Sequence, residues 1–144
     1  MKEYKIDFEQ SKSLYEQHKD RLEVKQCYKN VWYIATSSHH YKKFKTGEWK
    51  VAYGVMPSIQ KLMVRHCFIV DDKGNAIDPT LFCVERQPDK DMTYIAHTVY
   101  KTFEDYFNAI TDNDNKPDLC KLLRKQDIEL NKELMKNGSL MIGW

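Results

Sequence analysis

Three residues of this chain have the types, the order and the local context that thiol chemistry requires. Cys27 begins a helix-like segment, His66 lies within a strand-like run, and Asp78 ends the next short strand, directly before a proline. A nucleophile, a base and an orienting carboxylate are the groups used in covalent acyl transfer. The sequence therefore predicts a type of reaction, whereas nothing in it identifies a substrate.

The local context suggests a separate role for each of the three residues. The free N–H groups and the dipole at a helix N-terminus favour a thiolate, so Cys27 is suited to be the nucleophile. His66 is suited to accept the thiol proton and later to protonate a leaving group. Asp78 is suited to hold the imidazole in the useful tautomer. The backbone N–H of Cys27 is the expected oxyanion donor.

Strand alternation supports a pairing of His66 with Asp78. In the run 62–70, Val64, His66, Phe68 and Val70 share one face, so a polar ring interrupts an apolar stripe. A buried imidazole needs a hydrogen-bond partner, and Asp78 across the hairpin can supply one. The alternative is purely structural: a packed thiol, a satisfied core histidine and a turn aspartate before proline.

The hydrophobic pattern predicts an α+β fold in a single domain spanning residues 1–144. Helices are expected over 7–20 and 27–35, followed by a polar loop to Gly47. Antiparallel strands are expected over 49–56, 62–70 and 92–100, with a hairpin turn at 71–75. The region 101–137 should contain helices over 103–110 and 117–136, the second ended by Gly138.

Composition limits the class of protein. Hydrophobic residues make up 42% and charged residues 31% of the 144, and no apolar run approaches the roughly 20 residues of a membrane span. The charged N-terminus lacks a signal segment, so a cytoplasmic protein with reduced thiols and no membrane partner is expected.

The four cysteines form no Cys-x-x-Cys pair, and we expect neither a metal nor a cofactor. The net charge of +2 gives no general argument for nucleic-acid binding.

Together these motifs resemble the transglutaminase-like branch of the papain-like cysteine superfamily, in particular short bacterial and phage proteins. The resemblance covers residues 22–83 and rests on Cys27-Tyr28-Lys29-Asn30, Tyr53-Gly54, His66 and Ile77-Asp78-Pro79-Thr80. It implies a nucleophile helix packed on an antiparallel sheet that carries the histidine and the aspartate. It also implies an acyl-enzyme formed from an amide, ester or thioester, with a protein or peptide as substrate.

Some positions depart from the pattern of that superfamily. No acidic residue stands between Ala52 and Gly54, and Phe68 replaces a tryptophan after the histidine. Gln26 is adjacent to the cysteine rather than several residues before it, so its side chain is only a candidate oxyanion donor. Asn30 lies one turn after Cys27 and is expected to brace the site. Tyr53 and Phe68 are candidates for a substrate groove, although strand aromatics commonly belong to the core.

Two classes of function therefore remain open. The first is a cysteine hydrolase or acyltransferase, with peptidase, amidase, deamidase and cross-linking activities unresolved. The second is a non-catalytic binding protein, such as a phage or mobile-element factor, on the same scaffold. Nucleic-acid binding through the basic run 39–45 is a third reading, weighed against an ordinary solvated loop.

Overall fold

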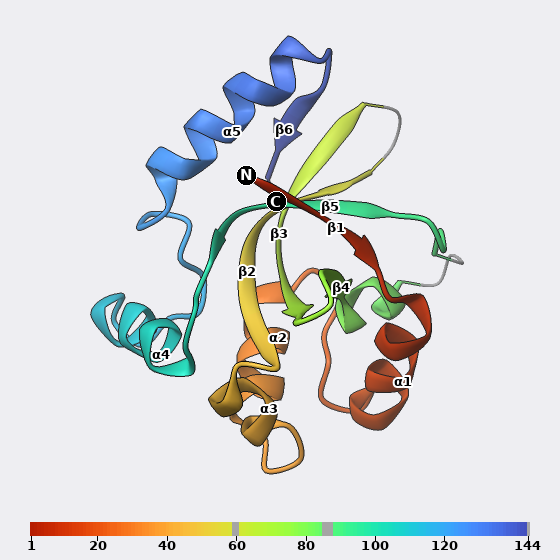
Figure 1. The fold of residues 1–144 in the computed structure, drawn as a ribbon, viewed down its shortest axis with the longest axis vertical. Coiled ribbons are helices and arrows are strands. Elements are labelled where there is room, and N and C mark those ends of the chain that lie inside the picture. Colours follow the sequence, from red (N-terminus) through yellow and green to blue (C-terminus); the bar gives the residue numbers. More distant parts are fainter. Residues whose placement is uncertain (59–60, 85–87, 144) are drawn as a thin grey trace.

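The computed structural model describes residues 1–58, 61–84 and 88–143, which form an α+β fold (Figure 1). The helices are α1 (Phe8–His18), α2 (Cys27–Thr36), α3 (Tyr41–Thr46), α4 (Phe103–Asp112) and α5 (Arg124–Lys136), with a 3₁₀ helix, η1 (Pro79–Cys83). The strands are β1 (Lys2–Ile6), β2 (Trp49–Pro57), β3 (Leu62–Asp71), β4 (Asn75–Ile77), β5 (Thr93–Val99) and β6 (Leu140–Ile142). No helix of the described residues is long and apolar enough to cross a membrane.

The strands form one sheet that closes into a small barrel. Their order is β2-β5-β1-β4-β3, and β2 also pairs with β3 to complete the ring, while β6 pairs with the first residues of β3, which β4 does not reach. The pairs β1–β4 and β3–β6 are parallel and the others are antiparallel. The expected antiparallel sheet is therefore corrected to a mixed, closed one, because β1 and β6 join it from the two ends of the chain.

Alternating side chains of the strands divide the core into two parts. Ala52, Phe68, Val70 and Tyr94 pack inside the barrel, as the alternation of the β3 sequence predicted for Phe68 and Val70. Residues of the opposite parity, such as Cys67 and Ile69, face outward and pack against the helices. Figure 1 shows α2 crossing behind the lower ends of β3 and β4, with α1 to one side. Helix α2 is thereby held against the strand that carries His66.

Two segments differ from the sequence prediction for local reasons. The expected helix over 117–136 begins only at Arg124. The preceding residues form turns, in which the Asp118 carboxylate accepts from Cys120 N and the Asn113 side chain donates to Asp118 O. Such side-chain bonds to the backbone compete with helix formation. The expected loop before Gly47 contains α3, because Phe44 is buried against the ring of Trp49.

Candidate active site

A buried network of hydrogen bonds inside the barrel forms the centre of the candidate site. His66 Nε2 lies 2.8 Å from Asp78 Oδ2, and Tyr94 donates its hydroxyl hydrogen to the same oxygen at 2.7 Å. His66 is 1% exposed and Asp78 is fully buried. Phe68 stacks on the imidazole, with ring centroids 6.3 Å apart and an interplanar angle of 15°. The predicted pairing of His66 with Asp78 is therefore present in the structure.

Cys27, the first residue of α2, reaches this network at the edge of β3. Its side chain interacts with both His66 and Cys67, two consecutive residues that point to opposite faces of the strand. On this edge β4 pairs only with Ile69 and Val70, and β6 only with residues 62–64. The middle of β3 is thus left open between two short strands, and the start of α2 approaches the histidine there.

The surroundings of His66 favour its charged form. Burial lowers the pKa of the imidazole, but the negative charge of Asp78 and the interaction with Cys27, each with a hydrogen bond, raise it by more, to about 10. His66 is consequently an imidazolium near neutral pH.

Asn30 joins α2 to the segment that carries Asp78. Its side-chain NH₂ donates to Thr80 Oγ1 at 3.0 Å and to Glu23 O at 2.8 Å, and its oxygen accepts from Glu23 N at 3.0 Å. The expectation that Asn30 braces the site agrees with these contacts. A second brace comes from α1, because Ser11 Oγ accepts from Asp78 N at 2.9 Å.

The other predicted site residues take different positions. Gln26 precedes α2 and borders a surface hollow of about 650 Å³ next to Tyr28. Tyr53 is buried, with its ring stacked on Tyr28 and its hydroxyl donating to Pro117 O at 2.9 Å. Phe68 lies wholly inside the barrel. The expectation that Tyr53 and Phe68 line an open groove is therefore corrected: both are core residues that support the site.

Residues 117–123, here called the covering segment, close the site from outside. Tyr53 binds its first residue, Pro117, and Tyr28 Oη lies 3.2 Å from Cys120 Sγ. Leu123 and Cys120 border a cavity of only about 10 Å³ that also touches His66. Cys27 is fully buried, and Leu119 and Leu123 of this segment belong to the same core cluster. The covering segment was not expected from the sequence, which predicted a helix over these residues.

Comparisons with protein-family models, curated proteins and solved structures found no match. The case for a function consequently depends on the geometry described above. That geometry brings Cys27, His66 and Asp78 together from α2, β3 and the residue after β4.

Tyr94 is the component of the network that sequence reasoning missed. The available signal was its position in a predicted strand, 92–100, but nothing local distinguishes a tyrosine bound to Asp78 from an ordinary core tyrosine.

Among the residues that the structure describes, no group of three or more His, Cys, Asp or Glu side chains could hold a metal ion.

Proposed function

We propose that this protein is a cysteine-dependent hydrolase or acyltransferase that acts on an amide, ester or thioester. The observation that carries the proposal is the convergence of Cys27, His66 and Asp78 in one buried network. Each of these side chains could be a structural residue by itself. A thiol at a helix start, beside an imidazolium paired with a buried carboxylate, is instead the arrangement expected of an activated nucleophile.

The proposed reaction begins from a pair in which His66 already carries the proton of the Cys27 thiol, so that the sulfur is a thiolate beside an imidazolium. Nε2 of the ring is engaged with Asp78, so Nδ1 is the nitrogen that would exchange this proton. The thiolate then attacks the substrate carbonyl carbon and forms a C–S bond. As the bond between that carbon and the leaving group breaks, His66 protonates the leaving group. The product of this half is a thioester on Cys27.

The second half returns the enzyme to its starting state. Water or an amine gives a proton to His66 and attacks the thioester carbon, and the Cys27 thiolate departs. Asp78 stabilises the imidazolium in both halves, and Tyr94 and Ser11 hold Asp78 in place. The backbone N–H of Cys27 at the start of α2 is the proposed donor to the oxyanion, with the Gln26 side chain as a further candidate.

This arrangement also supports the transglutaminase-like resemblance as a proposal. The cysteine at a helix start, the histidine on an adjacent barrel strand and the aspartate at the end of the next one agree with the pattern of that superfamily. The position of Asn30, which links α2 to the segment after Asp78, agrees with it as well. This support comes from where the residues lie in the fold and not from a related sequence.

A trapping experiment tests the enzyme hypothesis directly. The folded protein is mixed with p-nitrophenyl acetate, quenched in acid and digested, and the acetyl thioester is located by mass spectrometry. We expect acetylation at Cys27 and its loss in Cys27→Ser. The matched control is Cys67→Ser, since Cys67 is equally buried but points to the outer face of β3. Acetylation of Cys27 only in denaturant would contradict the proposal.

One observation favours the alternative of a non-catalytic binding protein. Cys27 is fully buried, so it meets a substrate only if the structure around it opens. In that alternative the network is a structural core, and Cys27 should react with iodoacetamide no faster than Cys67 in the folded protein. Faster labelling of Cys27 under native conditions favours the enzyme.

A further inference from the structure

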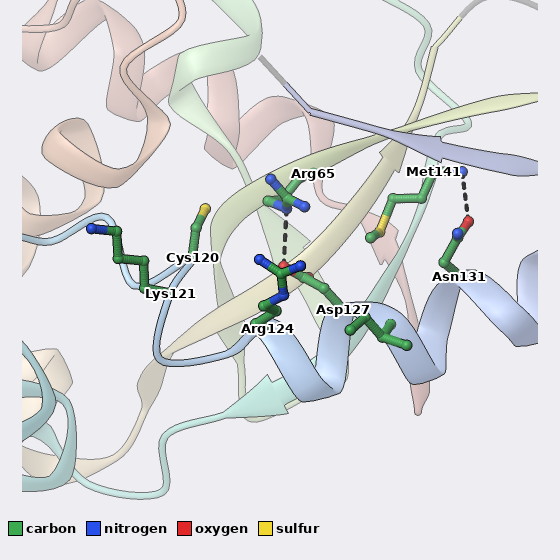
Figure 2. Close-up of a pocket in the computed structure, with 8 residues that line it drawn as sticks. Arg65, Cys120, Lys121, Arg124, Asp127, Asn131 and Met141 are labelled. Atoms are coloured by element: carbon green, nitrogen blue, oxygen red, sulfur yellow. Dashed lines mark hydrogen bonds and ion pairs between the residues drawn. The ribbon is translucent and has the colours of Figure 1, made fainter.

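A hollow lined by positive charge lies beside the covering segment. It has a volume of about 480 Å³ and is bordered by β3, the covering segment, α5 and β6. Arg65, Lys121 and Arg124 supply three cationic side chains to its wall, and Asp127 supplies the single carboxylate (Figure 2). The lining therefore has an excess of positive charge.

The carboxylate of Asp127 is already engaged on two sides. Its Oδ2 lies 3.0 Å from Arg65 Nε, and its Oδ1 lies 2.8 Å from His97 Nε2. Lys121 and Arg124, by contrast, form no ion pair with a residue that the structure describes. Two cations of the hollow thus remain available to a ligand.

The guanidinium of Arg65 lies between α5 and Gly143. Its Nε forms an ion pair with Asp127 Oδ2 at 3.0 Å, and its Nη1 lies close to Gly143, where an added Cβ would stand only 2.8 Å away. A guanidinium has planar pairs of N–H groups, which suit paired hydrogen bonds to a carboxylate or phosphate. Arg65 therefore offers such a donor at the wall of the hollow.

The hollow adjoins the candidate active site. Arg65, Cys120 and Asp127 line the hollow and also border the small cavity that touches His66 and Gly54. Arg65 directly precedes His66 on β3, with its side chain on the outer face. The hollow and the small cavity that His66 borders thus share three lining residues.

We propose that the hollow binds an anionic oxygen group of the substrate, a carboxylate or a phosphate, and directs the neighbouring carbonyl to Cys27. This inference rests on the proposed function and narrows its substrate class to acyl compounds that carry a negative charge. Arg65 and Arg124 would bind the oxygens through planar N–H pairs, and Lys121 would add a point charge. Asp127 would keep Arg65 oriented.

The test compares two alkylating reagents that differ by one charge. Iodoacetate is an anion and iodoacetamide is neutral, and both transfer a two-carbon group to a thiolate with loss of iodide. Each rate at Cys27 is measured by peptide mapping and divided by the rate of the same reagent with the unfolded chain. The relative rate for iodoacetate is then divided by the relative rate for iodoacetamide. This ratio measures the attraction of an anion to the site, because the general reactivity of the thiol affects both reagents equally.

For the folded protein at low salt we expect a ratio of about ten in favour of iodoacetate. Lys121→Gln combined with Arg124→Gln should bring the ratio close to one, because any change in access to Cys27 affects both reagents and cancels in the ratio. The matched control combines Lys125→Gln with Lys132→Gln, which removes the same charge from exposed positions of α5 outside the hollow. A second control combines Lys29→Gln with Lys116→Gln at the hollow next to Gln26.

Competing anions identify the group that the hollow prefers. Acetate and inorganic phosphate, added at equal ionic strength, should each slow iodoacetate more than iodoacetamide, and the stronger competitor indicates a carboxylate or a phosphate. If Cys27 labels rapidly but the ratio is one, or only the Lys29 and Lys116 pair lowers it, the anion inference is wrong and the enzyme hypothesis stands. If neither reagent labels folded Cys27, both proposals are overturned together.

Discussion

Tyr94 and His66 bind the same oxygen of Asp78. The phenol hydroxyl donates at 2.7 Å and the imidazole Nε2 lies at 2.8 Å, and both side chains project into the barrel from different strands. Two donors on one carboxylate oxygen fix its direction more firmly than the histidine could alone. The tyrosine therefore belongs to the site as a positioning residue, although it has no part in the bond-making steps proposed for Cys27.

Replacement of Tyr94 by phenylalanine should show the strength of this contact. Tyr94→Phe keeps the ring but removes a hydrogen bond to a buried carboxylate, so we expect the free energy of unfolding to fall by about 1–3 kcal/mol. Urea denaturation measures the change. Tyr41→Phe is the control, since the Tyr41 hydroxyl is part of an exposed side chain. An equal loss in both variants would contradict the role assigned to Tyr94.

The helix start at Cys27 and the pairing of His66 with Asp78 could be predicted from the sequence, whereas the barrel that surrounds them could not. The helix start at Cys27, the inward parity of His66 and the position of Asp78 are local properties, fixed by spacing within single elements. The short strand β1 and the bond from Tyr94 to Asp78 depend on closure of the barrel. That closure places Tyr4 opposite Tyr94 and brings β4 to the other edge of β1. No short stretch of the sequence indicates which of these distant strands will pair.

The covering segment was missed for a different reason. The helix was expected to begin at Pro117, which suits a first helical turn. Leu119 and Leu123 are both buried and have helical spacing. Asp118 and Asn113 nevertheless hold the backbone in turns, and Asp114 and Asn115 have positive φ angles of 57° and 61°. Side-chain bonds to the backbone thus outweighed the hydrophobic period.

The charge state of His66 predicts how stability depends on alkaline pH. Its pKa in the folded protein is about 10, above the ordinary value of 6.5, so the folded state holds a proton that the unfolded state releases in this interval. The stabilisation is complete below pH 6.5 and is lost as the pH rises toward 10. The difference in unfolding free energy between the wild type and His66→Gln should therefore shrink from pH 6.5 to 9.5. A constant difference would show that His66 is neutral in the fold.

A histidine pair away from the site predicts the opposite dependence in acid. His40 Nε2 lies 2.9 Å from His18 Nε2, and His40 stacks on Trp49. Burial lowers the pKa of His40 to about 4, assisted by the nearby charges of His18 and Lys43. The unfolded state then binds a proton first, so stability should fall as the pH drops from 6.5 toward 4.

His40→Gln tests this acid dependence, because glutamine does not titrate in this range but can still form hydrogen bonds. Thermal unfolding between pH 4 and pH 7 should show a weaker loss of stability in acid than the wild type shows. His39→Gln is the control, because the neighbouring His39 is exposed. If both variants keep the wild-type slope, the acid sensitivity comes from other groups.

Gly54 predicts a steric limit next to His66. It pairs with His66 across β2 and β3, and a Cβ at this position would collide with Ile95 O and stand 2.8 Å from Ala96 Cα. Since both obstacles are backbone atoms of β5, Gly54→Ala should destabilise the protein by about 3 kcal/mol or more, as measured in urea. Gly74→Ala, where only a positive φ of 84° opposes the new methyl group, should cost about 1 kcal/mol. Similar losses in the two variants would mean that β5 shifts easily.

The last prediction concerns access to Cys27 beneath the covering segment. Tyr53 donates to Pro117 O at 2.9 Å and so fixes the start of this segment. Tyr53→Phe removes the bond and keeps the ring stacked on Tyr28, so the open form should gain about 1 kcal/mol relative to the closed form. When opening is fast and precedes reaction, that shift makes iodoacetamide label Cys27 about fivefold faster. Tyr100→Phe, which alters a neighbouring ring of the same cluster, should leave the rate unchanged. Faster labelling of Cys27 and Cys67 alike would indicate general loosening of the fold, whereas an effect confined to Cys27 identifies the covering segment as the barrier between solvent and thiol.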